Sequence, residues 1–521
     1  MRGSRMPVSR RHFLGLTAAG TVLGAAGCSA CPVPPAGPFR PRAEIVPASA
    51  AAAVFVAEGV IAAPGDRGPF TIAELLAAPS FFVAHRGSGD NWPEHTMRAY
   101  QSSVDAGLKA IEVSVSSTRE EVLVCHHDLN ALRLTGIDLT IPRASYAAVE
   151  SLRNDARAWL GPATPLEPIP LLTDVLDAFA ATHVIFLEDK PGTNADEILE
   201  LLENYPNARE HIVWKQPASS PGHDLAAARG YTTFGYMTSR EKERVAELSP
   251  GVDVLGVHHT APEAMIREMV GTGKPVAAWE VHRRSEHARL LNLGVRGFIC
   301  SNIRNVLHLD APRMEDSFAD GRRGTGDLPW AADAVWDEQP SFVDGAVRIS
   351  SRETSGYVLG SMAESVNVPE WELEFELRWP ERVPAGRNGA GVAFGQDGDG
   401  PYRAGDPRSV VGYHLDFTAD GTLTLYRQDG GTSPAVSLAH VSSPAPVPGE
   451  WVALVVAMSP GRIAARRAGG GSQTWTAESD DIRYGGAWLS LLKNYIAGPP
   501  VEFRRVRLRE PSAKDGCSAV G

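Results

Sequence analysis

The chain has 521 residues, of which 43% are hydrophobic and 21% charged, and its formal net charge is −12. This length exceeds one ordinary hydrophobic core and predicts roughly two to four domains. The composition is that of a soluble globular protein. The acidic balance, without a long basic run, argues against nucleic-acid binding.

The first 28 residues are predicted to be an export signal. Arg10 and Arg11 precede an apolar stretch that, at ~15 residues, is too short to span a bilayer. This arrangement resembles a twin-arginine signal, and residues 25–28 (Ala-Ala-Gly-Cys) resemble a lipoprotein box that would make Cys28 the acylated residue. We expect an exported protein, either secreted or held as a lipoprotein on the outer face of the cytoplasmic membrane. A Pro/Ala-rich tether is predicted over 29–68.

The cysteines are too few for a dense disulfide framework. They stand at positions 28, 31, 125, 300 and 517. Cys125 and Cys300 lie inside apolar runs, so both are predicted to be small buried hydrophobic residues.

Residues 69–312 are predicted to form one domain of alternating strands and helices. Strand-like apolar runs fall at 81–85, 108–115, 122–127, 184–188, 211–215, 232–237, 252–258, 275–281 and 297–301. This alternation predicts a parallel sheet with helices outside, most economically a closed (β/α)8 barrel. The gap from 115 to 122 is too short for a helical crossover, so 122–127 is predicted to be a hairpin-like excursion that leaves eight barrel strands.

The composition changes after the barrel. We predict a polar linker over 313–328, an all-β sandwich over 329–511 and a tail over 512–521. Residues 371–379 alternate strictly between apolar and charged side chains, which indicates a strand buried on one face. Trp371 and Trp379 are therefore expected in the core. By pattern the domain resembles concanavalin- or laminin-G-like jelly rolls, and a carbohydrate or cell-wall ligand is an expectation from that analogy.

Polar side chains gather where the predicted barrel strands end. Functional residues of such barrels lie at the carboxyl ends of the strands, which predicts His85 and His127 at one mouth. Period-two alternation puts Glu112 and Ser114 on the same face of their strand. Glu188 ends a further apolar run.

The chemistry of this set is that of phosphodiester cleavage. Two glutamates can hold a hard divalent cation, which together with Arg86 and Lys190 can neutralise a phosphate. Two histidines can deprotonate an attacking hydroxyl and protonate a leaving group.

The same residues carry a family resemblance. The run His-Arg-Gly at 85–87, followed by Pro-Glu-His-Thr at 93–96, resembles the H-R-G…P-E-N-T opening of glycerophosphodiester phosphodiesterases. Residues 111–115, 127–136 and 188–190 are similar to that family's E-x-D, H-D-x-x-L-x-R-x-T and E-x-K motifs.

The resemblance implies a TIM barrel and a divalent metal, Ca²⁺ or Mg²⁺, in the site of a phosphodiesterase. It implies His85 and His127 as general acid and base, and a small-molecule or polymeric phosphodiester as substrate. The other implied roles are phosphate binding by Arg86 and Lys190, metal binding by Glu112 and Glu188, and support of the site by Glu94, Asp128 and Trp279.

The sequence departs from the family pattern at three places. Ser114 replaces the metal-ligating aspartate, and a neutral hydroxyl is a poor ligand for a hard cation. His95 replaces the asparagine of the opening motif, and Trp279 is followed by Glu-Val-His rather than Thr-Val-Asn. Metal binding would then be weakened or would recruit Asp189 or Glu280.

Three readings remain open from the sequence. The first is an exported phosphodiesterase that acts on glycerophosphodiesters or related polymers. The second is a binding protein with an impaired barrel site, which the loss of the aspartate at position 114 favours. The third is a phospholipase D-type lyase that stops at a cyclic phosphate.

Overall fold

The computed structural model describes residues 60–510, apart from 64, 325–326, 328–339, 353, 405, 407–408, 431–433 and 470–471. The predicted export signal with Cys28, the tether up to residue 59 and the tail from 512 lie outside the described residues. Within the described ranges, no helix has both the length and the apolar character that a membrane crossing requires.

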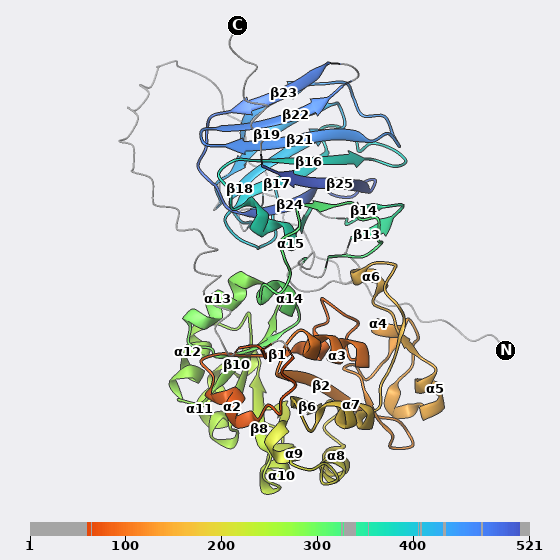
Figure 1. Cartoon of the computed structure of the whole chain (residues 1–521), viewed down its shortest axis with the longest axis vertical. Coiled ribbons are helices and arrows are strands. Elements are labelled where there is room, and N and C mark those ends of the chain that lie inside the picture. The colour runs from red at the N-terminus through yellow and green to blue at the C-terminus, as the bar shows by residue number, and fades with distance from the viewer. Residues whose placement is uncertain are drawn as a thin grey trace, which may run out of the picture. The chain divides into compact units, whose positions relative to one another are not determined.

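Residues 81–300 contain a closed barrel of eight parallel strands (Figure 1). In order round the barrel they are β1 (Phe81–Ala84), β2 (Ala110–Ser117), β6 (Val184–Asp189), β7 (Ile212–Pro217), β8 (Thr232–Met237), β9 (Val254–His258), β10 (Val276–Val281) and β11 (Gly297–Cys300). Ala84 pairs with both Cys300 and Ile111, which closes the circle. The short strand β3 (Leu123–Cys125) pairs antiparallel with β2. The predicted eight-stranded barrel with a hairpin excursion is confirmed.

Helices connect the barrel strands along the chain. They are α2 (Ile72–Ala77), α3 (Met97–Asp105), α4 (Leu132–Thr135), α5 (Tyr146–Glu150), α6 (Arg157–Leu160), α7 (Leu172–Phe179), α8 (Ala195–Leu202), α9 (Ala208–His211), α10 (Gly222–Ala228), α11 (Val245–Leu248), α12 (Glu263–Gly271), α13 (Arg284–Asn292) and α14 (Ile303–Val306), with a two-stranded ribbon of β4 (Arg153–Asn154) and β5 (Glu167–Pro168). Helix α3 begins where the Thr96 hydroxyl accepts a hydrogen bond from the Ala99 amide at 3.1 Å. The last residue of the Pro-Glu-His-Thr motif is therefore a helix cap.

Alternate residues of the strands fill the barrel interior in layers. One apolar cluster draws on all eight strands through Phe81, Val83, Ala110, Val184, Phe186, Val213, Phe234, Val254, Ala277 and Ile299. Two residues further along five of these strands, the same face carries Glu112, Glu188, Lys215, Tyr236 and Trp279. The period of two thus sets a polar layer at the carboxyl ends of the strands, directly above an apolar floor.

Residues 315–509 contain two packed antiparallel sheets. The first has β13 (Ser341–Val343), β14 (Ala346–Ile349), β25 (Val501–Arg509), β16 (Trp371–Arg378), β21 (Val452–Ser459), β22 (Arg462–Ala468) and β23 (Thr474–Ser479) in spatial order, with β12 (Glu315–Asp316) also on β25. The second has β15 (Ser355–Val358), β24 (Trp488–Asn494), β17 (Gly389–Gln396), β18 (Gly412–Thr418), β19 (Thr422–Gln428) and β20 (Val436–Ser442), and a short helix, α15 (Gly360–Ala363), follows β15. Both sheets contribute to one hydrophobic core. The predicted all-β sandwich is confirmed, while its laminin-G-like identity and the domain boundaries stay predictions.

Trp371, the first residue of β16, and Trp379, which directly follows this strand, lie in this core. Trp371 is 2% exposed and Trp379 is 1% exposed, as their alternation with charged residues predicts. A ring buried to this degree cannot stack on a sugar. The expected carbohydrate ligand therefore gains no support from these two residues.

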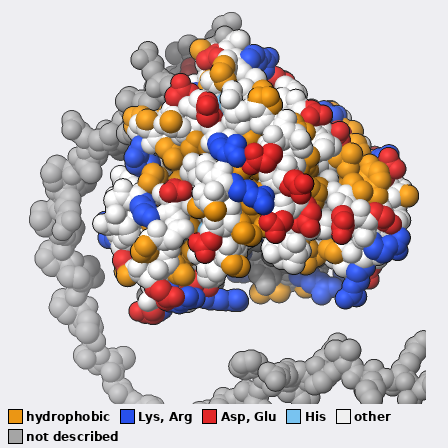
Figure 2. All heavy atoms as spheres, turned by 90° about the horizontal axis from the view of Figure 1, so that it is seen from below, with side chains coloured by type: hydrophobic (Ala, Val, Ile, Leu, Met, Phe, Trp, Pro, Cys, Tyr) orange, Lys and Arg blue, Asp and Glu red, His pale blue; other side chains and the backbone are white. Residues whose placement is uncertain are grey.

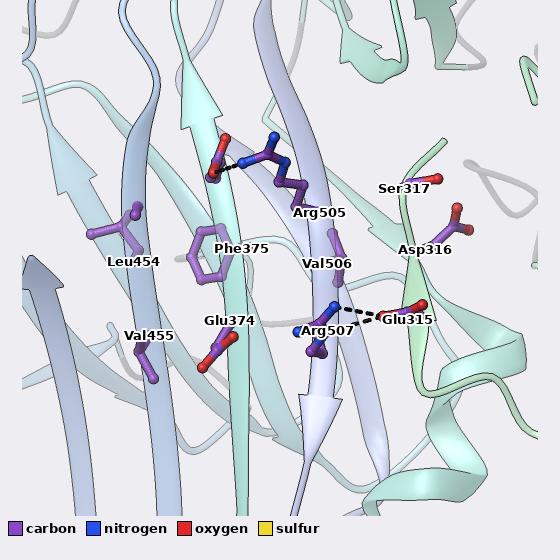
Figure 3. A pocket seen from close by; sticks show the side chains of 12 residues that line it. Glu315, Asp316, Ser317, Glu374, Phe375, Leu454, Val455, Arg505, Val506 and Arg507 are labelled. Carbon is purple, nitrogen blue, oxygen red and sulfur yellow. Dashed lines mark hydrogen bonds and ion pairs between the residues drawn. The ribbon is translucent and has the colours of Figure 1, made fainter. Parts of the chain in front are cut away.

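The outer part of the first sheet is hollowed beside residues 315–317, over a volume of about 620 Å³ (Figure 3). Two ion pairs join charged groups of its lining: Arg505 with Glu376 at 3.0 Å and Arg507 with Glu315 at 2.9 Å. These four side chains thus have partners within the hollow.

Basic and acidic side chains are interspersed over the face drawn in Figure 2, with hydrophobic side chains scattered between them. A nucleic-acid-binding face gathers its basic residues in a patch or stripe. The face drawn in Figure 2 shows no such patch or stripe.

Replacing Gly256 with alanine should destabilise the barrel. A Cβ at this position in β9 would lie 2.4 Å from Phe234 Cζ and 2.7 Å from Tyr236 Cβ. Overpacking of this kind costs about 1–3 kcal/mol. The matched control is Gly271→Ala at the end of α12, where an added Cβ has no heavy atom within 4 Å, and where we expect no loss of stability. Urea unfolding compares the two variants, and equal stability of both would contradict the layered packing.

Candidate active site

The first histidine lies at the carboxyl end of β1, in the mouth of the barrel. His85 Nδ1 is 2.7 Å from the Ser301 hydroxyl, and Nε2 is 3.5 Å from Glu112 Oε2. Glu280 Oε2 is 3.8 Å from Nδ1. His85 is 5% exposed, and its ring lies between a hydroxyl and two carboxylates.

The backbone after this histidine turns sharply toward α3. Arg86 has a left-handed φ of 53°, and Gly87 has a φ of 78°. A Cβ on Gly87 would lie 2.7 Å from the Ala99 Cβ of α3, so only glycine fits here. The turn points the Arg86 amide at Glu112 Oε2, which accepts its hydrogen bond at 3.2 Å.

A chain of ion pairs connects Arg86 to the second histidine. Glu94 is 3% exposed and lies 3.2 Å from Arg86 Nη1 and 2.6 Å from Arg133 Nη2. Arg133 Nε donates to Asp128 Oδ2 at 2.6 Å, and Asp128 Oδ1 lies 2.7 Å from His127 Nδ1. This arrangement, the Arg86–His127 relay, holds the His127 ring by Nδ1 and leaves Nε2 outside these contacts.

Both histidines favour the neutral form in the free protein. Burial lowers the pKa of His127 to about 4, with a further lowering by Arg86, against the raising effect of Asp128. Burial also lowers the pKa of His85, although Glu112 and Glu280 act in the opposite direction. The Arg86 charge lowers both pKa values, so one guanidinium is the common electrostatic neighbour of the two rings.

A lysine lies between the two glutamates that were predicted to hold a metal. Lys215 Nζ is 2.8 Å from Glu112 Oε1 and also contacts Glu188 Oε2. Glu188 further accepts hydrogen bonds from Lys190 at 3.0 Å and from the Tyr236 hydroxyl at 2.9 Å. Burial opposes the charge on Lys215, but Glu112 and Glu188 outweigh it and raise the pKa of this lysine. The same lysine lowers the pKa of both glutamates against the effect of their burial.

The donors in this layer do not fit a divalent cation. Ca²⁺ and Mg²⁺ need six or more oxygen ligands, whereas here each glutamate is engaged by Lys215 and the remaining position offers the Ser114 hydroxyl. A divalent ion about 4 Å from an ammonium is repelled by about 8 kcal/mol at an effective dielectric constant of about 20. Among the residues that the structure describes, no group of three or more His, Cys, Asp or Glu side chains is placed to hold a metal ion.

The two alternative ligands considered for a weakened metal site are also engaged. Asp189 accepts hydrogen bonds from the Asn194 amide at 2.7 Å and from its side chain at 2.8 Å. Glu280 lies 3.4 Å from His282 and 3.8 Å from Arg86. Asp189 therefore belongs to the turn after β6, and Glu280 to the histidine and arginine groups of the mouth.

Comparisons with known proteins find a similarity between the barrel and one enzyme family. Residues 85–216 match the model of the glycerophosphoryl diester phosphodiesterase family. Over 230 residues the chain is 24% identical to the putative glycerophosphodiester phosphodiesterase YhdW of Bacillus subtilis, which covers 42% of this chain and 93% of that protein. The match to this family covers residues 85–216 of the 521, which is the part of the barrel that carries both histidines.

Other similar proteins match over fewer residues or at a lower sequence identity. The human lysophospholipase D GDPD1 is 31% identical over 139 residues, which are 25% of this chain and 43% of that protein. The chain thus spans less than half the length of this relative. A solved phosphodiesterase of Oleispira antarctica, in complex with the product sn-glycerol-3-phosphate, is 18% identical with a TM-score of 0.38 and covers 44% of this chain and 95% of that one.

Two residues of the mouth that have structural roles were not predicted from the sequence. Lys215 was missed, although it stands two residues after the interior Val213 at the end of a predicted strand, which is a usable signal. Arg133 is the arginine of the motif at 127–136, for which no role was predicted. It forms ion pairs with both Glu94 and Asp128 and so joins them. Trp279 lines the mouth, with its ring 5.3 Å from that of Tyr236.

Two further histidines of the barrel have structural partners, and its two cysteines are buried. His95 Nδ1 lies 2.7 Å from the Tyr100 hydroxyl, and His126 Nδ1 lies 2.8 Å from the Asp128 carbonyl. Cys125 and Cys300 are buried and free, as predicted.

Acid should destabilise the folded chain partly through His127. Unfolded His127 takes up a proton near its usual pKa of 6.5, whereas the folded residue does so only near pH 4. The unfolded state therefore binds more protons between these values, and the free energy of unfolding falls as the pH is lowered through them. Urea unfolding at several pH values should show a shallower fall for His127→Gln than for the wild type.

The matched control for this measurement is His440→Gln, because His440 is exposed in β20. This variant should keep the wild-type pH dependence. Identical slopes for His127→Gln and the wild type would contradict the lowered pKa of His127.

Proposed function

We propose that this chain is a phosphodiesterase that hydrolyses glycerophosphodiesters or related small or polymeric phosphodiesters. One observation carries the proposal: both histidines are tied to the same arginine. His85 lies beside Glu112, which accepts the Arg86 amide, and the Arg86–His127 relay reaches the other ring through Glu94. Two imidazoles with one common guanidinium neighbour suit acid and base catalysis at a single phosphoryl group.

The contacts support different roles for the two rings. His127 Nδ1 is bonded to Asp128, so the proton belongs on Nδ1 and the Nε2 lone pair can act as general base. His85 is the better general acid, because the charges of Glu112 and Glu280 oppose the lowering of its pKa by burial and a bound phosphodiester anion would raise that pKa.

The reaction then runs in two steps. His127 removes the proton of a substrate hydroxyl as its oxygen bonds to phosphorus, and His85 protonates the alcohol oxygen as its bond to phosphorus breaks. Arg86 and Lys190 bind the non-bridging phosphate oxygens. Water then opens the cyclic phosphate with the roles of the two histidines exchanged.

The names of the relatives favour this class of reaction. The Bacillus protein is called a putative glycerophosphodiester phosphodiesterase and the human one a lysophospholipase D. Both names denote cleavage of a phosphodiester, and they support a substrate with a glycerol-linked phosphate for this chain.

Location and accessory ligands belong to the same proposal. The twin-arginine-like and lipobox-like residues near Cys28 support action outside the cytoplasm, as a secreted or lipid-anchored enzyme. A cell-wall carbohydrate bound by the sandwich stays a prediction. Ca²⁺ or Mg²⁺ at Glu112 and Glu188 also stays a prediction, and the contacts of Lys215 argue against it.

Alanine at either histidine should abolish most of the activity. His85→Ala and His127→Ala should each lower kcat/KM about 10²- to 10⁴-fold, because each removes one proton transfer. The assay uses bis(p-nitrophenyl) phosphate and glycerophosphocholine. His440→Ala, an exposed histidine of the sandwich, is the control and should keep wild-type activity.

The same assay distinguishes the two alternative functions, a binding protein and a phospholipase D-type lyase. A wild type that binds glycerophosphocholine without cleaving it would support the binding protein. Phosphorus NMR of the products distinguishes the third, since a lyase would leave the cyclic phosphate as the final product. Retained activity in both histidine variants would refute the proposed mechanism.

A further inference from the structure

Lys215 lies between two buried carboxylates, whose negative charges require a nearby cation. Its Nζ bridges the buried carboxylates of Glu112 and Glu188, and it is itself 6% exposed. The ammonium also lies 4.8 Å from the centre of the Tyr236 ring, a cation–π contact. Two carboxylates and an aromatic ring, carried by β2, β6 and β8, therefore surround the one positive charge of Lys215 on β7, above the apolar floor.

The charge of this layer balances with Ser114 present. An aspartate at position 114, together with Glu112 and Glu188, would carry a charge of about −3, which a divalent ion reduces to about −1. With serine the two glutamates carry about −2, which the single charge of Lys215 also reduces to about −1. The Ser114 hydroxyl donates a hydrogen bond to Glu188 at 3.5 Å. Because this hydroxyl is neutral, it adds no negative charge for Lys215 to compensate.

We propose that the ammonium of Lys215 is the resident cation of this site and replaces the divalent metal ion. Lys215 is a positioning residue: it holds Glu112, which in turn accepts the Arg86 amide and lies beside His85. The effect on catalysis rests on the function proposed above, whereas the effect on metal binding does not.

The decisive measurement is cation binding by the full chain. Isothermal titration with Ca²⁺ and with Mg²⁺ compares the wild type with Lys215→Met/Ser114→Asp, in which the ammonium is lost and the third carboxylate is restored. We expect no stoichiometric binding to the wild type and one Ca²⁺ per chain in the double variant, with at least a 100-fold gain in affinity. Lys242→Met, at an exposed lysine, is the matched control and should behave as the wild type.

Activity gives a second readout. Hydrolysis of bis(p-nitrophenyl) phosphate by the wild type should be unchanged by EDTA. Lys215→Met should lower kcat about 10²- to 10³-fold, as removal of a preorganised charge contact does. The double variant should regain activity with Ca²⁺ and lose it again with EDTA, a response that a purely structural lysine would not produce.

The outcomes are separable. Stoichiometric Ca²⁺ binding by the wild type, or wild-type activity that EDTA abolishes, overturns the proposal. A folded double variant that binds Ca²⁺ no better than the wild type also overturns it; Lys215→Ala/Ser114→Asp replaces that variant if circular dichroism shows it unfolded. An inactive wild type with the expected binding results would refute the phosphodiesterase function and leave the role of Lys215 standing.

Discussion

The mouth of the barrel depends on one ammonium held between two buried carboxylates. Glu112 and Glu188 are 2% and 1% exposed and stand directly above an apolar layer, where an uncompensated charge is strongly destabilising. Lys215 supplies that compensation. Because Glu112 also accepts the Arg86 amide, the position of the His-Arg-Gly turn follows from the same ion pair.

The Arg86–His127 relay is the second charge network of the mouth, and it begins at the side chain of Arg86. Its guanidinium pairs with Glu94, and the Arg86–His127 relay continues through Arg133 to the far imidazole. Glu94 lies two residues before the Thr96 cap of α3, so the helix start fixes its backbone. Two buried charge networks thus meet at one residue, and the separation of the two histidines is set by ion pairs as well as by the strands that carry them.

The sequence was sufficient to predict the architecture and only part of the site. All nine strand candidates exist, because long apolar runs and a gap too short for a crossover are local signals. Trp371 and Trp379 were predictable as core from strict alternation. Lys215 was missed because a lysine that ends an apolar run can also be a solvated strand end. Its spacing of two from Val213 favours an inward side chain, and the register of β7 against β6 places it beside Glu188.

Ser114 and Lys215 make sense only as a pair. With serine alone, the two glutamates would keep an excess of buried negative charge that a single hydroxyl cannot offset. With lysine alone, an aspartate at 114 would add a third carboxylate to one ammonium, and a divalent ion recruited to balance it would face that ammonium at close range. Residues that share a charge network in this way have strongly non-additive effects. The serine, which by itself suggests a decayed metal site, therefore becomes half of an intact electrostatic arrangement once its partner on β7 is seen.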